Sequence, residues 1–131
     1  MFNKIKKELE KLNIGIVYLF GSRAQGLAKK DSDMDIGIVF TGPVESASLL
    51  LIYEKLYSLF LTAGRKQKAE IDIVFLQSAS LSLQFNAIKY GRVVYEISTK
   101  FRASYEEKVM LFHGDFEPVS REFDKMVLAR I

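Results

Sequence analysis

Three aspartates stand at positions where their carboxylates could together hold divalent metal ions. Asp33 and Asp35 are two residues apart at the start of a predicted strand, and side chains two apart in a strand point to the same face. Two carboxylates this close repel each other unless a cation lies between them. Because Asp-x-Asp alone is a common pattern, the alternative is that Asp33 belongs to a turn or a helix cap.

Asp72 strengthens the metal hypothesis because it lies in a strand predicted over residues 70–76, in which all the other residues after Glu70 are apolar. A lone carboxylate in a buried strand is unfavourable unless it is paired or bound to a metal. A salt bridge to Arg65, Lys66 or Lys68 is the alternative. The chain has no cysteine and a single histidine. A metal must therefore be held by oxygen, which suits magnesium, or manganese as an alternative, rather than zinc.

A short segment directly after the first apolar run could bind phosphate: Gly21, Ser22 and Arg23. Glycine lets the backbone approach a ligand closely, and successive backbone amides attract phosphate oxygens. The Ser22 hydroxyl adds a donor, and Arg23 adds positive charge. The alternative is a tight turn followed by a helix cap. The segment is not a P-loop, because no Gly-Lys-Ser/Thr follows it.

The elements that would position these residues follow from the hydrophobic periodicity. An amphipathic helix opens the chain, and apolar runs predict four strands, at residues 14–20, 34–40, 70–76 and 93–97. A long helix separates the second strand from the third, and another helix separates the third from the fourth. Ser104 with Glu107 forms a capping-box pattern for a C-terminal helix, which Pro118 interrupts. This order predicts an α/β chain of the α+β type, a mixed sheet of about four strands covered by helices.

The size and composition fit a single domain, residues 1–131, and exclude several classes of protein. Hydrophobic residues make up 49% and charged residues 27%, as in ordinary globular proteins. The net charge of +3 is compatible with a polyanionic ligand without requiring one. The most apolar long stretch, residues 44–63, carries a Glu-Lys pair near its middle, which predicts a buried helix rather than a membrane span. We see no signal peptide and expect a cytoplasmic location.

Taken as a set, these motifs resemble the minimal nucleotidyltransferases of the DNA polymerase beta superfamily. The resemblance covers nearly the whole chain. It is carried by five segments: residues 21–26, residues 32–36, Asp72 in its apolar strand, residues 91–96 and residues 115–118. Gln25 stands where a basic residue is frequent in the family, which would weaken phosphate contacts slightly.

The resemblance implies a nucleotidyltransferase fold and transfer of a nucleoside monophosphate from a triphosphate to a hydroxyl. By the family pattern, Asp33 and Asp35 bind two magnesium ions. Asp72 binds the catalytic one and is a candidate to help deprotonate the acceptor. Gly21 and Ser22 hold the triphosphate. Small stand-alone members often serve as antitoxins, which use ATP to adenylylate a tyrosine of an all-helical ribonuclease toxin of the HEPN class.

Two other functions stay open. A non-catalytic module could bind a nucleotide and neutralise its partner by occlusion, although three intact aspartates disfavour this. A nucleotidyltransferase acting on a small molecule, such as an antibiotic, is the other. A template-directed polymerase and direct nucleic-acid binding are disfavoured, because the sequence shows no second DNA-binding domain. A partner could bind the aromatic residues Phe112, Phe116 and Phe123, or these could simply cover the sheet.

Overall fold

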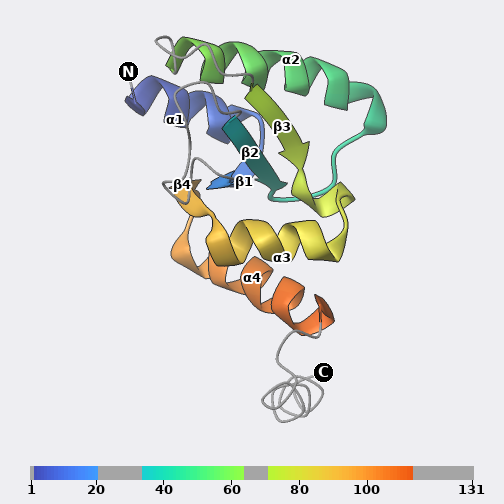
Figure 1. The fold of residues 1–131 in the computed structure, drawn as a ribbon. Coiled ribbons are helices and arrows are strands. Elements are labelled where there is room, and N and C mark those ends of the chain that lie inside the picture. Colours follow the sequence, from blue (N-terminus) through green and yellow to red (C-terminus); the bar gives the residue numbers. More distant parts are fainter. Residues whose placement is uncertain (1, 21–33, 64–70, 114–131) are drawn as a thin grey trace.

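The computed structural model describes residues 2–20, 34–63 and 71–113, and the elements occur in the predicted order (Figure 1). The strands are β1 (Ile14–Phe20), β2 (Met34–Phe40), β3 (Ile71–Phe75) and β4 (Arg92–Glu96). The helices are α1 (Phe2–Lys11), α2 (Ser46–Ala63), α3 (Leu81–Tyr90) and α4 (Thr99–His113), with a short 3-10 helix η1 (Leu76–Ser78) after β3.

The four strands form one mixed sheet, as predicted, and their order in the sheet is β3-β2-β1-β4. β1 runs antiparallel to both β2 and β4, whereas β2 and β3 are parallel. A parallel pair needs a crossover connection, and α2 supplies it. Because β2 and β3 run in the same direction, both begin at the end of the sheet where β1 ends and β4 begins. We call this the acid end, because Asp35 and Asp72 lie there, and the opposite end the far end.

Helices α1 and α2 cover one face of the sheet, and the packing there is apolar (Figure 1). Each buried aliphatic side chain stabilises the fold by about 1.5–3 kcal/mol, so this face contributes much of the stability. The buried cluster consists of Leu9, Ile14, Val17, Ile36, Ile38, Phe40, Leu56, Ile71, Ile73 and Tyr95.

The long helix α2 is less buried than its sequence predicts. Leu56 is fully buried against the sheet, but Leu50 and Leu51 are 67% and 63% exposed. The apolar residues run around the whole helix rather than along one stripe, so the sheet can cover only part of them. No helix in the described ranges is both long and apolar enough to cross a membrane.

Helices α3 and α4 cover the opposite face, where polar side chains are paired inside an apolar cluster. Tyr18 of β1 donates a hydrogen bond to Glu106 of α4 at 2.6 Å, and Tyr105 of α4 donates one to Gln84 of α3 at 2.8 Å. The buried cluster on this face consists of Ile16, Tyr18, Phe20, Val39, Leu76 and Ala87. The two faces therefore differ in chemistry as well as in the helices that cover them.

The start of α4 corrects the capping-box prediction. The helix begins at Thr99, and the Ser98 hydroxyl accepts a hydrogen bond from the backbone N–H of Phe101 at 3.0 Å. The predicted capping pair, Ser104 and Glu107, lies inside the helix. Ser98 caps the helix because it immediately precedes Thr99, where the first N–H groups of the helix have no partner within the helix and need an acceptor.

Gly91 ends α3 at its C-terminal cap. Its N–H donates to the carbonyl of Ala87 at 2.9 Å, and a Cβ at this position would lie 2.2 Å from the same oxygen. A side chain is therefore excluded by the close approach of the helix end to the chain entering β4. The predicted helix break at Pro118 lies outside the described residues.

Candidate nucleotide and metal site

The structure places two of the three predicted metal ligands side by side. Asp35 is the second residue of β2, Asp72 is the second residue of β3, and the two are direct partners in the parallel register. Neighbouring strands lie about 4.8 Å apart, and residues in register project to the same face of the sheet. Asp35 is half-buried and Asp72 is exposed. The two carboxylates therefore meet at the acid end within reach of solvent.

Both carboxylates belong to the face that α3 and α4 cover. Their sequence neighbours Ile36 and Ile73 pack into the α1/α2 cluster, and alternate residues of a strand point to opposite faces. Next to Asp35 on its own face is Gly37, where a Cβ would lie against buried side chains of the α3/α4 cluster. The acids are thus bordered by apolar packing toward the far end and by the end of the sheet on the other side.

The other predicted site residues lie outside the described residues: Gly21, Ser22, Arg23 and Asp33. The basic residues between positions 65 and 68, which were the alternative partners of Asp72, lie outside them as well. β1, whose sequence leads into Gly21, ends at Phe20, and Phe20 is the antiparallel partner of Asp35. The strand therefore ends beside one of the two acids.

The carboxylate pair has the oxygen donors that magnesium or manganese takes in proteins. Like charges directly opposite on neighbouring strands are destabilising, on the scale of about 0.2–1 kcal/mol, and a divalent cation removes that repulsion. Within residues 2–20, 34–63 and 71–113, no group of three or more His, Cys, Asp or Glu residues could hold a metal ion. The observed pair fits an oxygen-liganded metal, and the third predicted ligand, Asp33, lies outside the described residues.

A polar network on the same face was not predicted from the sequence. Tyr18 is 1% exposed and donates to Glu106, and Arg102 donates to Glu106 at 3.2 Å and to Glu96 at 3.0 Å. Burial, reinforced by the hydrogen bond to Glu106, raises the pKa of Tyr18 far above its ordinary value of 10.0. The hydroxyl is therefore a permanent donor that ties β1 to α4, while Arg102 ties α4 to β4.

A signal for part of this network is present in the sequence. Tyr18 stands in a strand that is apolar on both sides, and a buried tyrosine hydroxyl usually finds a hydrogen-bond partner. Its partner, however, is 88 residues away in the chain. No local pattern links positions so distant, so the pairing becomes visible only once α4 is packed on the sheet.

A comparison with protein families decides the identity of the domain. Residues 3–100 match the family described as Polymerase beta, Nucleotidyltransferase, a range that contains both acids of the observed pair. The chain belongs to this nucleotidyltransferase family. The resemblance drawn from the motifs is thereby confirmed, and the mixed four-stranded sheet covered by helices is consistent with the nucleotidyltransferase fold.

Several solved structures share the fold of this nucleotidyltransferase domain over its full length. A toxin–antitoxin structure with AMP-PNP is 22% identical at a TM-score of 0.63, covering 97% of this chain and 98% of the other. The MntA–HepT toxin–antitoxin is 20% identical at 0.59, covering 97% and 96%. A tri-AMPylated HEPN toxin in complex with MNT antitoxin, from Shewanella oneidensis, is 18% identical at 0.56, covering 98% and 99%. No curated protein matches the chain.

Proposed function

We propose that this protein is a magnesium-dependent nucleotidyltransferase, with manganese as an alternative metal, that transfers AMP from ATP to a hydroxyl of a partner protein. The partner is a helical toxin of the HEPN class, the acceptor is a tyrosine, and the protein acts as the antitoxin in the cytoplasm. The observation that carries the proposal is the Asp35–Asp72 pair, in register on adjacent strands of a domain that matches the nucleotidyltransferase family. Similar folds solved with AMP-PNP and with a tri-AMPylated toxin support the choice of nucleotide and partner.

In this proposal, Asp33, Asp35 and Asp72 hold the metal ions. When bound, two metal ions neutralise the charge of the triphosphate and align the acceptor with the leaving group. The carboxylate of Asp72, the more exposed of the described pair, accepts the proton of the acceptor hydroxyl. The acceptor oxygen bonds to the α-phosphorus, the bond from that phosphorus to the bridging oxygen breaks, and pyrophosphate leaves.

The triphosphate is assigned to the segment that follows β1. The Gly21 backbone and the Ser22 hydroxyl donate hydrogen bonds to phosphate oxygens, and Arg23 adds positive charge. The end of β1 at Phe20, the register partner of Asp35, supports this assignment, because the segment starts one residue further along the chain.

A protein acceptor is favoured because the described part of the chain holds no second domain that could grip a small substrate. All four described helices are used to cover the two faces of one sheet. In-line transfer needs the acceptor oxygen held about 3–3.5 Å from the α-phosphorus. A folded partner can supply that positioning with its own rigid surface.

The test is to incubate the protein with labelled ATP, magnesium and the helical protein encoded beside it, and to locate an adenylate mass increment by mass spectrometry. Wild type should modify a tyrosine of that protein and Asp35→Asn should not. Glu45→Gln, which changes an exposed acid outside the pair, should act as wild type. Label on a small molecule alone would favour the antibiotic-type reading. An unmodified partner neutralised equally by wild type and Asp35→Asn would favour occlusion.

A further inference from the structure

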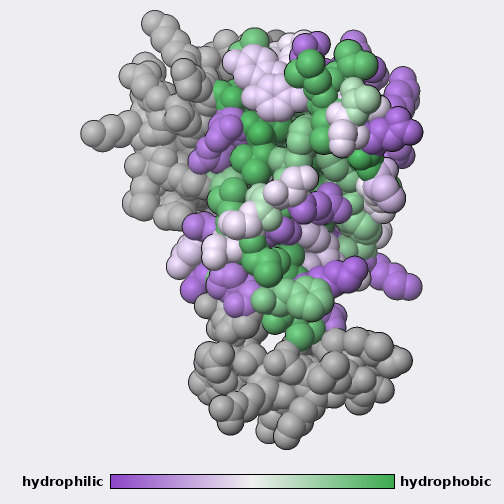
Figure 2. All heavy atoms as spheres, turned by 90° about the vertical axis from the view of Figure 1, so that its right-hand side faces the viewer, coloured by the Kyte–Doolittle hydropathy of each residue, from purple (hydrophilic) through white to green (hydrophobic). Residues whose placement is uncertain are grey.

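One side of the molecule exposes more apolar side chains than is usual for a surface that contacts only water. Figure 2 looks onto the side where α2 begins and α4 ends, and it shows hydrophobic atoms running down this side between hydrophilic ones. Phe112 on α4 is 69% exposed and Leu81 at the start of α3 is 41% exposed. Contiguous exposed apolar surface of this kind commonly marks an interaction site. Because its side chain is exposed, Phe112 does not cover the sheet. The other two aromatic residues of the predicted interface, Phe116 and Phe123, lie outside the described residues.

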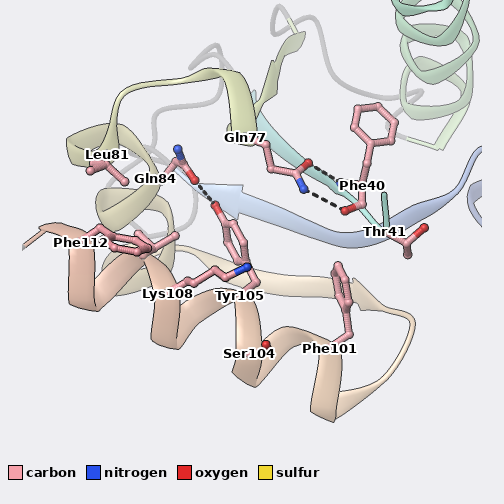
Figure 3. Close-up of a pocket in the computed structure, with 11 residues that line it drawn as sticks. Phe40, Thr41, Gln77, Leu81, Gln84, Phe101, Ser104, Tyr105, Lys108 and Phe112 are labelled. Carbon is pink, nitrogen blue, oxygen red and sulfur yellow. Dashed lines mark hydrogen bonds between the residues drawn. The ribbon is translucent and has the colours of Figure 1, made fainter. Parts of the chain in front are cut away.

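Two hollows of about 340 and 220 Å³ lie next to each other on this side and share Phe40 and Gln77. The larger lies between α3, α4 and the end of β2 (Figure 3). The smaller lies between the end of β3 and the segment that leads into α2. We call the two together the far-end trough. Its apolar lining includes Val44, Leu49 and Phe75 in the smaller hollow and Leu81, Val109 and Phe112 in the larger one.

The amide side chains of the far-end trough are already paired within the protein. Gln77 donates to the carbonyl of Phe40 at 2.9 Å and accepts from its N–H at 2.7 Å (Figure 3). Gln84 donates to the carbonyl of Ala79 at 3.0 Å and accepts from the Tyr105 hydroxyl at 2.8 Å. A polar ligand would have to compete with these bonds, whereas an apolar side chain can enter without leaving a polar group unpaired.

Among the described residues that line either hollow, Lys108 has the one charged side chain. It is exposed on α4, and Figure 3 shows it between Phe112 and Tyr105. A single cation beside an apolar trough favours an incoming segment that carries a carboxylate next to its apolar side chains. The lining thus favours an occupant that carries both apolar side chains and a carboxylate.

We infer that the far-end trough docks a helix of the partner protein, with apolar side chains from neighbouring helical turns in the two hollows and an acidic side chain facing Lys108. The existence and helical nature of this partner rest on the proposed function. The far end is the opposite end of the sheet from Asp35 and Asp72. Docking there leaves the acids open, so the surface that grips the partner and the site that modifies it are separate.

The experiment measures binding without nucleotide, by titrating the purified helical protein encoded beside the chain into full-length variants in a calorimeter. Phe112→Ala and Lys108→Glu should each weaken binding by about tenfold or more. Both residues are exposed, so the variants should keep the circular-dichroism spectrum of wild type. Leu61→Ala and Ile97→Ala are the matched controls, because each residue is 48% exposed and lines neither hollow. They should bind as wild type does.

Equal affinity of wild type, Phe112→Ala and Lys108→Glu would overturn the docking surface, and adenylylation of the partner would leave the proposed function intact. Conversely, weaker binding by the two trough variants together with no adenylylation by wild type would support the docking surface and remove the proposed function. A wild-type dimer that Phe112→Ala converts to a monomer would assign the far-end trough to a second copy of the chain and overturn the inference.

Discussion

The two faces of the sheet are stabilised in different ways. Under α1 and α2 the buried cluster is apolar, and Ile14, Ile38 and Leu56 are each 0% exposed. Under α3 and α4 the apolar residues share the face with hydrogen-bonded Tyr18 and Gln84 and with both acids of the candidate site. The candidate site lies on the α3/α4 face, so we expect a division between the faces. Changing the acids should leave the fold intact, and weakening the α1/α2 core should leave the proposed chemistry intact.

The largest expected effect is on the acid pair. Asp35→Asn should lower the transfer rate about 100-fold or more, because changing even an outer-shell partner of a metal ligand lowers activity or metal affinity by 10–100-fold. Without divalent metal the variant should melt at the same temperature as wild type or slightly higher, since a like-charge repulsion is removed. Rates from labelled ATP and melting curves with and without magnesium check this. An undiminished rate would separate the acid pair from the reaction.

The next largest effect is on the α1/α2 face, where we expect a loss of stability without a loss of transfer rate. Leu56→Ala should lower the free energy of unfolding by about 2–5 kcal/mol, because it opens a cavity where the side chain is fully buried. Leu51→Ala, on the same helix but 63% exposed, should change it by less than about 0.5 kcal/mol. Urea denaturation measures both. At a temperature where Leu56→Ala is folded, its transfer rate should match wild type, and a large rate loss there would break the division between the faces.

The Tyr18–Glu106 bond tests whether the polar face is also structural. Tyr18→Phe should cost about 1.5–3 kcal/mol of stability, the range for a hydrogen bond to a charged group. Burial raises the folded-state pKa of Tyr18 above the ordinary 10.0, so above pH 10.0 the unfolded chain releases a proton that the folded chain keeps. The free energy of unfolding should therefore fall as pH rises beyond that value.

Tyr18→Phe should make this alkaline loss of stability shallower. Burial also raises the pKa of Tyr105, so the double variant Tyr18→Phe/Tyr105→Phe should lose stability with rising pH even less steeply. This second change in slope should be smaller than the change caused by Tyr18→Phe alone. Denaturation at a series of pH values from neutral to alkaline measures both slopes. Identical slopes in wild type and Tyr18→Phe would show that Tyr18 titrates in the folded protein as it does in the unfolded chain.

The smallest effect concerns the packing next to the acids. Gly37→Ala places a Cβ 2.8 Å from Leu76 Cδ1 and 3.3 Å from Phe20 Cε1, and overpacking of this kind costs about 1–3 kcal/mol. Gly42→Ala is the matched control, because nothing lies within 4 Å of its Cβ. It should be neutral or stabilise by up to about 1 kcal/mol, by restricting the unfolded chain. If the two variants had equal melting temperatures, the tight packing beside Asp35 would be refuted.

The order of the elements could be predicted from the sequence because it depends on local periodicity. The meeting of Asp35 and Asp72 also has a sequence basis. A helix between two strands favours parallel pairing, which brings the starts of both strands to the same end of the sheet, and each acid lies near the start of its predicted strand. The start of α4 could not be predicted, since a capping-box pattern inside a helix looks the same as one at its beginning. Ser98 takes that role only because β4 ends two residues earlier.

Contacts between distant segments of the chain could not be predicted from the sequence. The Tyr18–Glu106 pair and the Gln77 amide that bonds both backbone groups of Phe40 depend on how the helices and η1 pack on the sheet. Phe112 illustrates the same limit on the surface: an aromatic residue on an amphipathic helix fits a buried or an exposed position equally well until the neighbours are known. The catalytic roles assigned to the acids, and those of Gly21, Ser22, Arg23 and Asp33, stay predictions.

Asp72 also has a consequence for solubility. In the described sheet β3 is an edge strand, and Asp72 is its one charged residue, between Ile71 and Ile73. Charged side chains on edge strands discourage the pairing of one molecule's sheet with another's. An apolar replacement would leave five consecutive residues of high β-propensity on that edge, a pattern prone to cross-β aggregation. Asp72→Val should therefore shorten the protein's lifetime in solution as well as remove a proposed metal ligand, whereas Asp72→Asn should only remove the ligand.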